Sequence, residues 1–162
     1  MKSIRIQLGI IAVLAGALLL AACGGSRGTG ASSPSPPALI HTASVKVGDK
    51  SVTVLKNLAG LTLYYFTPDT STKIACTGGC ASSWPPLIAT SETPTSNPML
   101  PGQLSVLSGP NGNQVLYNEH PLYTYSKDGG AADAYGQGIG GKWFVATPDL
   151  AAAVAASSTP IY

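Results

Sequence analysis

The sequence predicts a small, mainly β domain that consists of two duplicated units of antiparallel strands and Gly-rich turns. One observation is that short alternating, β-branched or aromatic runs recur from Ser44 onward, whereas the sequence lacks long segments with helical periodicity. The other is that Leu63-Tyr64-Tyr65-Phe66 and Leu122-Tyr123-Thr124-Tyr125 are similar at an offset of 59 residues. The roughly 100 residues that follow Ser44 are enough chain for one core.

The individual strands are expected from local patterns. Residues 45–47 and 51–55 alternate with period two, and residues 61–66 are rich in β-branched and aromatic side chains. Asn111-Gly112 lies between two further runs and is typical of a tight hairpin turn. A short helix is expected to begin at Thr147-Pro148-Asp149, where Thr is a possible cap and Pro suits the first helical position. The later strand candidates are residues 103–107, 114–117, 122–125 and 143–146.

More residues keep the offset of 59. Asp69 corresponds to Asp128, and Trp84 corresponds to Trp143. The sequence therefore predicts that the two Trp side chains occupy equivalent buried places and pack against each other in a pseudo-two-fold arrangement. The aromatic residues expected in this repeat core are Tyr64, Phe66, Trp84, Tyr123, Tyr125 and Trp143.

The N-terminal segment predicts export from the cytoplasm. Lys2 and Arg5 precede an apolar run that is too short for a membrane span of about 20 residues, as in a signal peptide. Cleavage is expected between Ala22 and Cys23, because the preceding residues are small. The stretch Leu20-Ala21-Ala22-Cys23 resembles the bacterial lipobox, which implies that the Cys23 thiol receives diacylglycerol and that its amine is acylated, as with palmitate.

The chain is thus expected to have four parts. Residues 1–22 form the signal peptide, and residues 23–43 form a lipidated cysteine with a disordered Gly-, Ser- and Pro-rich tether. Residues 44–147 form the duplicated domain, with repeats over about 52–90 and 113–147, and residues 148–162 form a tail or short helix. The expected location is the cell envelope, on the periplasmic or outer face of a bacterial membrane, with membrane lipid as the partner of Cys23.

Charge excludes one class of partner. Removing 22 of the 162 residues leaves 140, and the loss of Lys2 and Arg5 lowers the basic count from 9 to 7, against 7 acidic residues. The mature chain therefore has a formal net charge of 0, and it lacks the clustered Lys and Arg that nucleic acid would need. We expect no nucleic-acid partner; a protein or small-molecule partner stays open.

Two sets of motifs occur in the order of the two repeats. The first unit contains Leu63-Tyr64-Tyr65-Phe66-Thr67-Pro68-Asp69, Cys76-Thr77-Gly78-Gly79-Cys80 and Trp84-Pro85-Pro86-Leu87, and the second contains the motifs at residues 117–123 and 136–145. These motifs resemble the two units of the bacterial lipoprotein family known as "secreted repeat of unknown function". The resemblance covers about residues 54–148 and implies the envelope location, the repeat and the fold. Because the family has no established activity, it implies no catalytic residue.

Cys76 and Cys80 are the candidates for chemistry. In an oxidising envelope two nearby cysteines form a structural disulfide as a rule. Two alternatives remain open: a redox-active pair, since short-loop disulfides are more reducible, and a metal site completed by His120, since soft thiolates with an imidazole suit Cu(I). His120 alone is typical of a solvated turn residue.

A glycine-rich segment needs a separate interpretation. Gly136, Gly138 and Gly141 fit the spacing of a dinucleotide-binding loop, but the preceding strand, following helix and later acidic residue of that motif are missing from the sequence. A turn that lets the backbone pass close to an aromatic ring is the better interpretation. The expected function is a non-enzymatic binding or interaction domain without a cofactor or metal. The alternative is an envelope redox or copper-handling factor that uses Cys76, Cys80 and His120.

Overall fold

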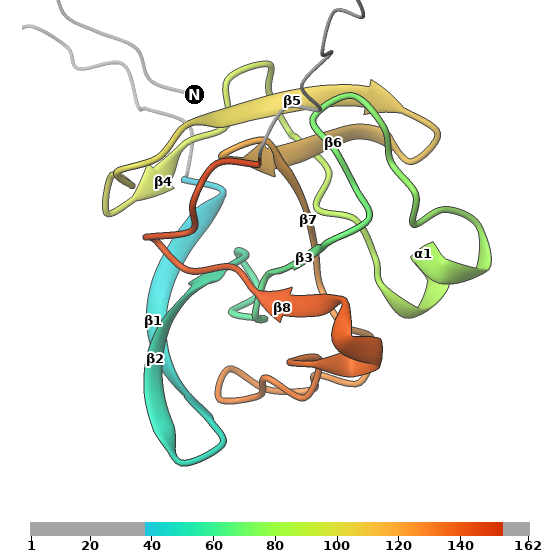
Figure 1. Cartoon of the computed structure of the whole chain (residues 1–162). Helices are drawn as coiled ribbons and strands as arrows, with labels where there is room; N and C mark the ends of the chain where they lie inside the picture. Colours follow the sequence, from blue (N-terminus) through green and yellow to red (C-terminus); the bar gives the residue numbers. More distant parts are fainter. Residues whose placement is uncertain (1–37, 154–162) are drawn as a thin grey trace, which may run out of the picture. The chain divides into compact units, whose positions relative to one another are not determined.

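The computed structural model describes residues 38–153, which fall within one compact unit (Figure 1). The predicted signal peptide, the lipidation site Cys23 and residues 23–37 of the predicted tether lie outside the described residues. No helix in the described part of the chain is both long and apolar enough to cross a membrane.

A three-stranded sheet begins the domain. Strands β1 (Ile40–Val47) and β2 (Lys50–Lys56) form a long antiparallel hairpin in which Val45 is opposite Val52. The hairpin turns at Gly48, whose φ of 58° suits glycine. Strand β4 (Ser96–Asn97) adds to the other edge of β1 in a parallel direction, so the sheet order is β2-β1-β4.

A five-stranded sheet contains strands of both repeats. Its order is β5-β6-β7-β3-β8, so that β3 of the first repeat lies between β7 and β8 of the second. Figure 1 shows β5 and β6 together at one end of the domain, away from the tip of the β1–β2 hairpin. The strand bounds are β3 (Tyr64–Phe66), β5 (Leu104–Gly109), β6 (Gly112–Tyr117), β7 (His120–Tyr123) and β8 (Trp143–Val145).

The β5–β6 connection is the predicted tight hairpin. Gly109 is opposite Gly112, so Pro110 and Asn111 form the turn. Gly112 has a φ of 93°, a value that a residue with a Cβ adopts only at a steric cost. The prediction of a hairpin around Asn111-Gly112 is therefore confirmed.

Each repeat completes the backbone hydrogen bonding of the other. Leu87 of the first repeat donates its N–H to the Leu122 carbonyl (2.9 Å) and accepts from the Val115 N–H (2.8 Å). At the equivalent place in the second repeat, Ala146 donates to the Leu63 carbonyl (2.8 Å) and accepts from the Leu55 N–H (2.8 Å). The prediction of a mainly β domain of two duplicated units is confirmed, and the two units are interlocked through their last segments.

The interior has two clusters of buried side chains. The aliphatic cluster centres on Ile40, Leu55 and Leu122, which are fully buried. The aromatic cluster consists of Tyr64, Cys76, Trp84, Tyr123 and Trp143, with Phe66, Cys80, Tyr125, Ile139 and Val145 partly buried around it.

The structure differs from the expected boundaries at both ends of the domain. Strand β1 begins at Ile40, before the expected start at Ser44, because Leu39 and Ile40 are buried in the aliphatic cluster. Residues 147–150 form a turn closed by the Leu150 N–H and the Thr147 carbonyl (3.1 Å), and residues 147–153 contain no helix. Helix α1 (Gly79–Ser83), the 3-10 turn η1 (Ile139–Gly141) and β4 have no counterpart among the predicted elements.

Candidate functional site

Four aromatic rings from both repeats form a continuous stack in the core. The Trp84 and Trp143 rings lie face to face, with centroids 3.7 Å apart and planes 2° from parallel. Tyr125 stacks on Trp84 at 4.3 Å, and Phe66 stacks on Trp143 at 4.3 Å. Each indole covers one face of the other, so Phe66 and Tyr125 lie on the two outer faces. The order of the rings is Phe66, Trp143, Trp84, Tyr125, and we call these four rings the aromatic stack.

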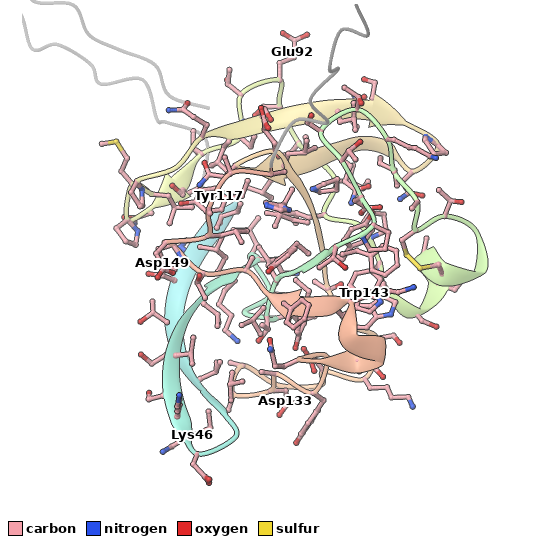
Figure 2. All side chains as sticks on the ribbon, viewed as in Figure 1. Lys46, Glu92, Tyr117, Asp133, Trp143 and Asp149 are labelled. Atoms are coloured by element: carbon pink, nitrogen blue, oxygen red, sulfur yellow. A yellow bond between two sulfur atoms is a disulfide. The ribbon has the colours of Figure 1, made fainter. Side chains whose placement is uncertain are left out.

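Two further tyrosines contact the central pair through their edges. Tyr64 meets Trp84 in a T-shaped arrangement at 5.5 Å, and Tyr123 meets Trp143 in the same way at 5.2 Å. Figure 2 shows Trp143 at the start of β8, with its side chain directed into the domain. Both Trp residues are only 5% exposed. Equivalent residues of the repeats thus make equivalent contacts.

Each edge-on tyrosine is hydrogen-bonded to an aspartate of the other repeat. The Tyr64 hydroxyl donates to Asp128 Oδ2 (2.6 Å), and the Tyr123 hydroxyl donates to Asp69 Oδ2 (2.6 Å). All four residues are buried. Each remaining carboxylate oxygen accepts a backbone N–H, from Ala75 at Asp69 (2.7 Å) and from Tyr135 at Asp128 (3.0 Å). The sequence offset predicted the equivalence of Asp69 and Asp128, but no sequence signal indicated that each would accept a hydrogen bond from the tyrosine of the other repeat.

Burial is the largest influence on the pKa values of Tyr64, Tyr123 and Asp69. It raises the pKa of the Tyr64 and Tyr123 phenols far above their ordinary value, and the adjacent carboxylates act in the same direction. Burial also raises the pKa of the Asp69 carboxyl, while the hydrogen bonds from Tyr123 and from backbone N–H groups oppose this rise. Both phenols therefore remain protonated donors at neutral pH.

The structure joins Cys76 and Cys80 in a disulfide with a Cα–Cα distance of 5.2 Å. Figure 2 shows the bond beside α1, and both cysteines pack against the aromatic cluster. Cys76 is fully buried, whereas Cys80 is partly exposed. The disulfide thus fixes α1 to the face of the aromatic cluster.

The structure places His120 at the start of β7 as a half-buried residue, not as the solvated turn residue that the sequence suggested. Its ring lies 4.7 Å from the Tyr65 ring, and Nε2 is 3.1 Å from the Ala151 carbonyl. Burial lowers the pKa of the imidazole. Among residues 38–153, no group of three His, Cys, Asp or Glu residues is placed to hold a metal ion, so His120 is not assembled with Cys76 and Cys80.

Lys56 is a buried charged residue that the sequence analysis did not single out. Its ammonium group donates to Thr62 Oγ1 (2.7 Å) and to the Ala131 carbonyl (2.8 Å). Burial lowers its pKa, and the charges of Asp128 and Asp133 oppose this change. A lysine at the end of an alternating strand gives no sequence signal of burial, because the loop that covers Lys56 is distant in the chain.

An open cleft with both polar and apolar lining residues lies between the tip of the β1–β2 hairpin and the loop after β7. Figure 2 shows Lys46 on the hairpin and Asp133 on the adjacent loop. The cleft has a volume of about 550 Å³, and Tyr135 at its edge is 67% exposed. The side-chain oxygen Oε1 of Gln137 accepts the Val145 N–H (2.8 Å), which leaves the side-chain amide N–H groups for other partners. The lining residues are Lys46, Val47, Gly48, Ala132, Asp133, Ala134, Tyr135 and Gln137.

These observations define a class of protein: an interlocked two-repeat β domain with a shared aromatic core. The family described as "secreted repeat of unknown function" matches residues 46–88 and 105–147, one match for each repeat. The chain belongs to this family. No curated protein and no solved structure matches the chain.

Proposed function

We propose that this protein is a lipid-anchored protein of the cell envelope, and that its β domain binds a polar ligand at the cleft between Lys46 and Tyr135 without transforming it. The observation that carries the proposal is the exposed Tyr135 ring at the edge of a cleft whose wall also has polar side chains. Ligand sites combine aromatic and apolar surface with a few polar groups that orient the ligand.

The chemistry of the cleft favours a saccharide. A flat aromatic face packs against the C–H face of a sugar ring, and its polar neighbours hydrogen-bond to hydroxyl groups. Lys46 supplies donors, and the free amide N–H groups of Gln137 supply more. Asp133 is less available, because its Oδ2 already accepts the N–H groups of Gly129 and Gly130 (2.9 and 2.8 Å).

The buried polar groups favour binding over catalysis. Tyr64, Tyr123, Asp69 and Asp128 satisfy one another inside the domain. A catalytic acid or base needs to reach a substrate proton. The polar groups that face the cleft are instead typical of recognition.

The binding proposal is tested by NMR titration of the folded chain with an oligomer of β-1,4-linked N-acetylglucosamine. We expect shift changes confined to residues around Tyr135, and their loss in Tyr135→Ala. Met99→Ala is the matched control, because Met99 is 89% exposed and does not line this cleft. Shift changes elsewhere, or unchanged binding by Tyr135→Ala, would contradict the proposed site.

The anchor is tested separately. Intact-mass analysis of protein made in a bacterium is expected to give a chain that begins at Cys23 and carries acyl mass. Cys23→Ser is expected to release the protein from membranes or to block its maturation, whereas Lys2→Ala only slows export. A soluble, unmodified mature chain would contradict the anchor and leave the binding site untouched.

A second candidate function is an envelope redox role of Cys76 and Cys80. The observation that favours it is the partial exposure of Cys80, which gives a reductant access to the bond. Reduction potentials of structural disulfides lie below about −300 mV. A potential well above that value would support this function in place of ligand binding. The copper-handling alternative is not carried further, because the structure does not bring His120 together with the two cysteines.

A further inference from the structure

Strand β5 is the outer strand of the five-stranded sheet, and within the part of the chain that the structure describes it pairs only with β6. Gln103, just before β5, faces β6, because its carbonyl accepts the Asn118 N–H (2.9 Å). Backbone groups of an antiparallel strand face alternately toward and away from the partner strand, so those of Leu104, Val106 and Ser108 face away from β6. Among residues 38–153, none forms a hydrogen bond with these outward groups.

Two other strand edges, on β2 and β8, are protected. On β2, the Leu55 N–H already donates to the Ala146 carbonyl (2.8 Å), and the strand begins with Lys50. On β8, the Val145 N–H donates to the Gln137 side chain (2.8 Å). Proteins block the addition of further strands with such charges and covering groups. Strand β5 has six residues, none of them charged or proline, so its edge is open to a further strand.

A cleft opens along the same strand. It has a volume of about 460 Å³ and is lined by residues 89–92 together with side chains of β5 and β6. Val106 and Ser108 line it from β5, and Glu92 lines it from the loop. Glu92 is exposed and is the only charged residue among residues 74–118. Figure 2 shows it on the outer side of β5, so one negative charge lies beside the unpaired backbone groups.

We propose that the β5 edge binds an extended peptide segment by strand addition, and that a Lys or Arg side chain of this segment pairs with Glu92. In this mode the backbone hydrogen bonds supply affinity, and a pocket beside the edge supplies specificity. In an antiparallel pair, the peptide residue opposite Val106 exchanges both hydrogen bonds with it and projects its side chain to the same face. A basic side chain at that place is thus directed to the cleft that Val106 and Glu92 line.

This surface is separate from the proposed ligand cleft, because the two clefts share no lining residue. Charge distinguishes the basic segment from a second copy of the chain. Two β5 strands that paired with each other would bring two Glu92 carboxylates to one interface, and like charges oppose such pairing. An acidic segment meets the same repulsion. A segment with a basic residue gains both the backbone hydrogen bonds and the ion pair.

The test is an NMR titration of the folded chain with the capped peptide Val-Thr-Lys-Thr-Val. When this peptide pairs with a strand, its Lys and Val side chains project to one face. We expect the amide shifts of Leu104, Val106 and Ser108 to change. The matched peptide Val-Thr-Glu-Thr-Val is expected to bind about fivefold more weakly, as for an exposed ion pair. Shift changes confined to other residues, or equal affinity for the two peptides, would overturn the proposal.

Variants separate the charge from the edge. Glu92→Gln is expected to give the two peptides equal affinity. Val106→Pro removes an outward N–H and leaves the hydrogen bonds to β6 in place, so it is expected to weaken the Lys peptide about tenfold. Ser108→Pro serves as the second variant if Val106→Pro does not fold. Thr53→Pro is the matched control, because Thr53 is exposed on another edge strand, β2, and it is expected to leave the affinity unchanged.

Three results would contradict these expectations. Unchanged affinity in both proline variants of β5, or an equal loss in Thr53→Pro, would overturn the proposal. So would a Val106 amide shift that depends on protein concentration without peptide, because it would assign the β5 edge to a second copy of the chain.

Discussion

At the residue scale, the crossed tyrosine–aspartate pairs join the two repeats. Removing the Tyr64 or Tyr123 hydroxyl leaves a buried carboxylate oxygen without its donor, at Asp128 or Asp69 respectively. Such a loss costs about 1–3 kcal/mol. We expect Tyr64→Phe and Tyr123→Phe each to lower the free energy of unfolding by this amount in urea denaturation. Tyr135→Phe is expected to leave it unchanged, and an equal loss in that control would contradict the assignment.

Gly136 is a position where the backbone passes against two aromatic rings, as the sequence analysis predicted for this turn. A Cβ there would lie 2.8 Å from Trp84 and 2.8 Å from Tyr64. Gly136→Ala is therefore expected to lower stability by about 1–3 kcal/mol, the usual cost of overpacking. Gly79→Ala is the matched control, because nothing lies within 4 Å of the added methyl group. Thermal melts of both variants check the expectation, and an unaffected Gly136→Ala would contradict this packing.

His120 makes stability depend on pH with a defined sign. Burial lowers the imidazole pKa of the folded state below its ordinary value of 6.5, so between the lowered pKa and pH 6.5 the folded state binds fewer protons than the unfolded state. The stability that the neutral His120 ring contributes is therefore complete above pH 6.5, and it is lost as the pH falls from 6.5 through the lowered pKa. Asp69 acts in the opposite sense, because burial raises its pKa: its contribution is complete below pH 3.8 and is lost as the pH rises.

The variant His120→Leu isolates the histidine contribution, because Leu61 stands at the equivalent place of the first repeat. We expect the wild type to lose more stability than His120→Leu between pH 7 and pH 5 in urea denaturation. The Asp69 effect is present in both proteins. A larger loss in the variant would show that the sign is wrong.

At the element scale, the disulfide holds α1, a helix of five residues that is too short to be stable alone. Closing so short a loop contributes about 2 kcal/mol on the chain-entropy argument. Reduction of the native protein is expected to lower the free energy of unfolding by about this amount while the domain stays folded. The double variant Cys76→Ser, Cys80→Ser is expected to match the reduced protein. Unfolding on reduction would indicate that α1 is essential to the core.

The elements show which structural features a local pattern predicts. Alternation in residues 51–55 and the Asn111-Gly112 turn predicted β2 and the β5–β6 hairpin, because both depend on neighbours in sequence. Strand β4 and helix α1 have too few residues to produce a period. Strand β4 exists because β1 offers an edge, which is a tertiary cause. Helix α1 lies where the local Cys76–Cys80 disulfide closes the chain, but the cysteine spacing alone does not show that the closed segment is helical.

At the scale of the whole molecule, the offset of 59 residues predicted that Trp84 and Trp143 would be equivalent, and the structure stacks them. The offset did not predict that the repeats would exchange their last segments. A duplication shows which residues are alike, but two separate copies and two interlocked copies have the same sequence pattern. The hydrogen bonds of Leu87 and Ala146 distinguish the two cases.

Interlocking predicts that neither repeat folds alone. A fragment of residues 38–99 would lack Trp143 and the Ala146 hydrogen bonds to Leu55 and Leu63, and a fragment of residues 100–153 would lack Trp84 and Leu87. Each would expose half of the aromatic stack and unpaired backbone groups, whose burial the intact chain achieves only jointly.

We expect each fragment alone to lack amide shift dispersion and a cooperative thermal transition. An equimolar mixture is expected to regain the near-ultraviolet circular dichroism of the stacked indoles, because association restores every exchanged hydrogen bond. Dilution should then lower the melting temperature of the mixture, as for any complex whose folding and association are linked. A fragment that melts cooperatively by itself as a monomer would show that the repeats are independent units, in contradiction to the exchanged segments.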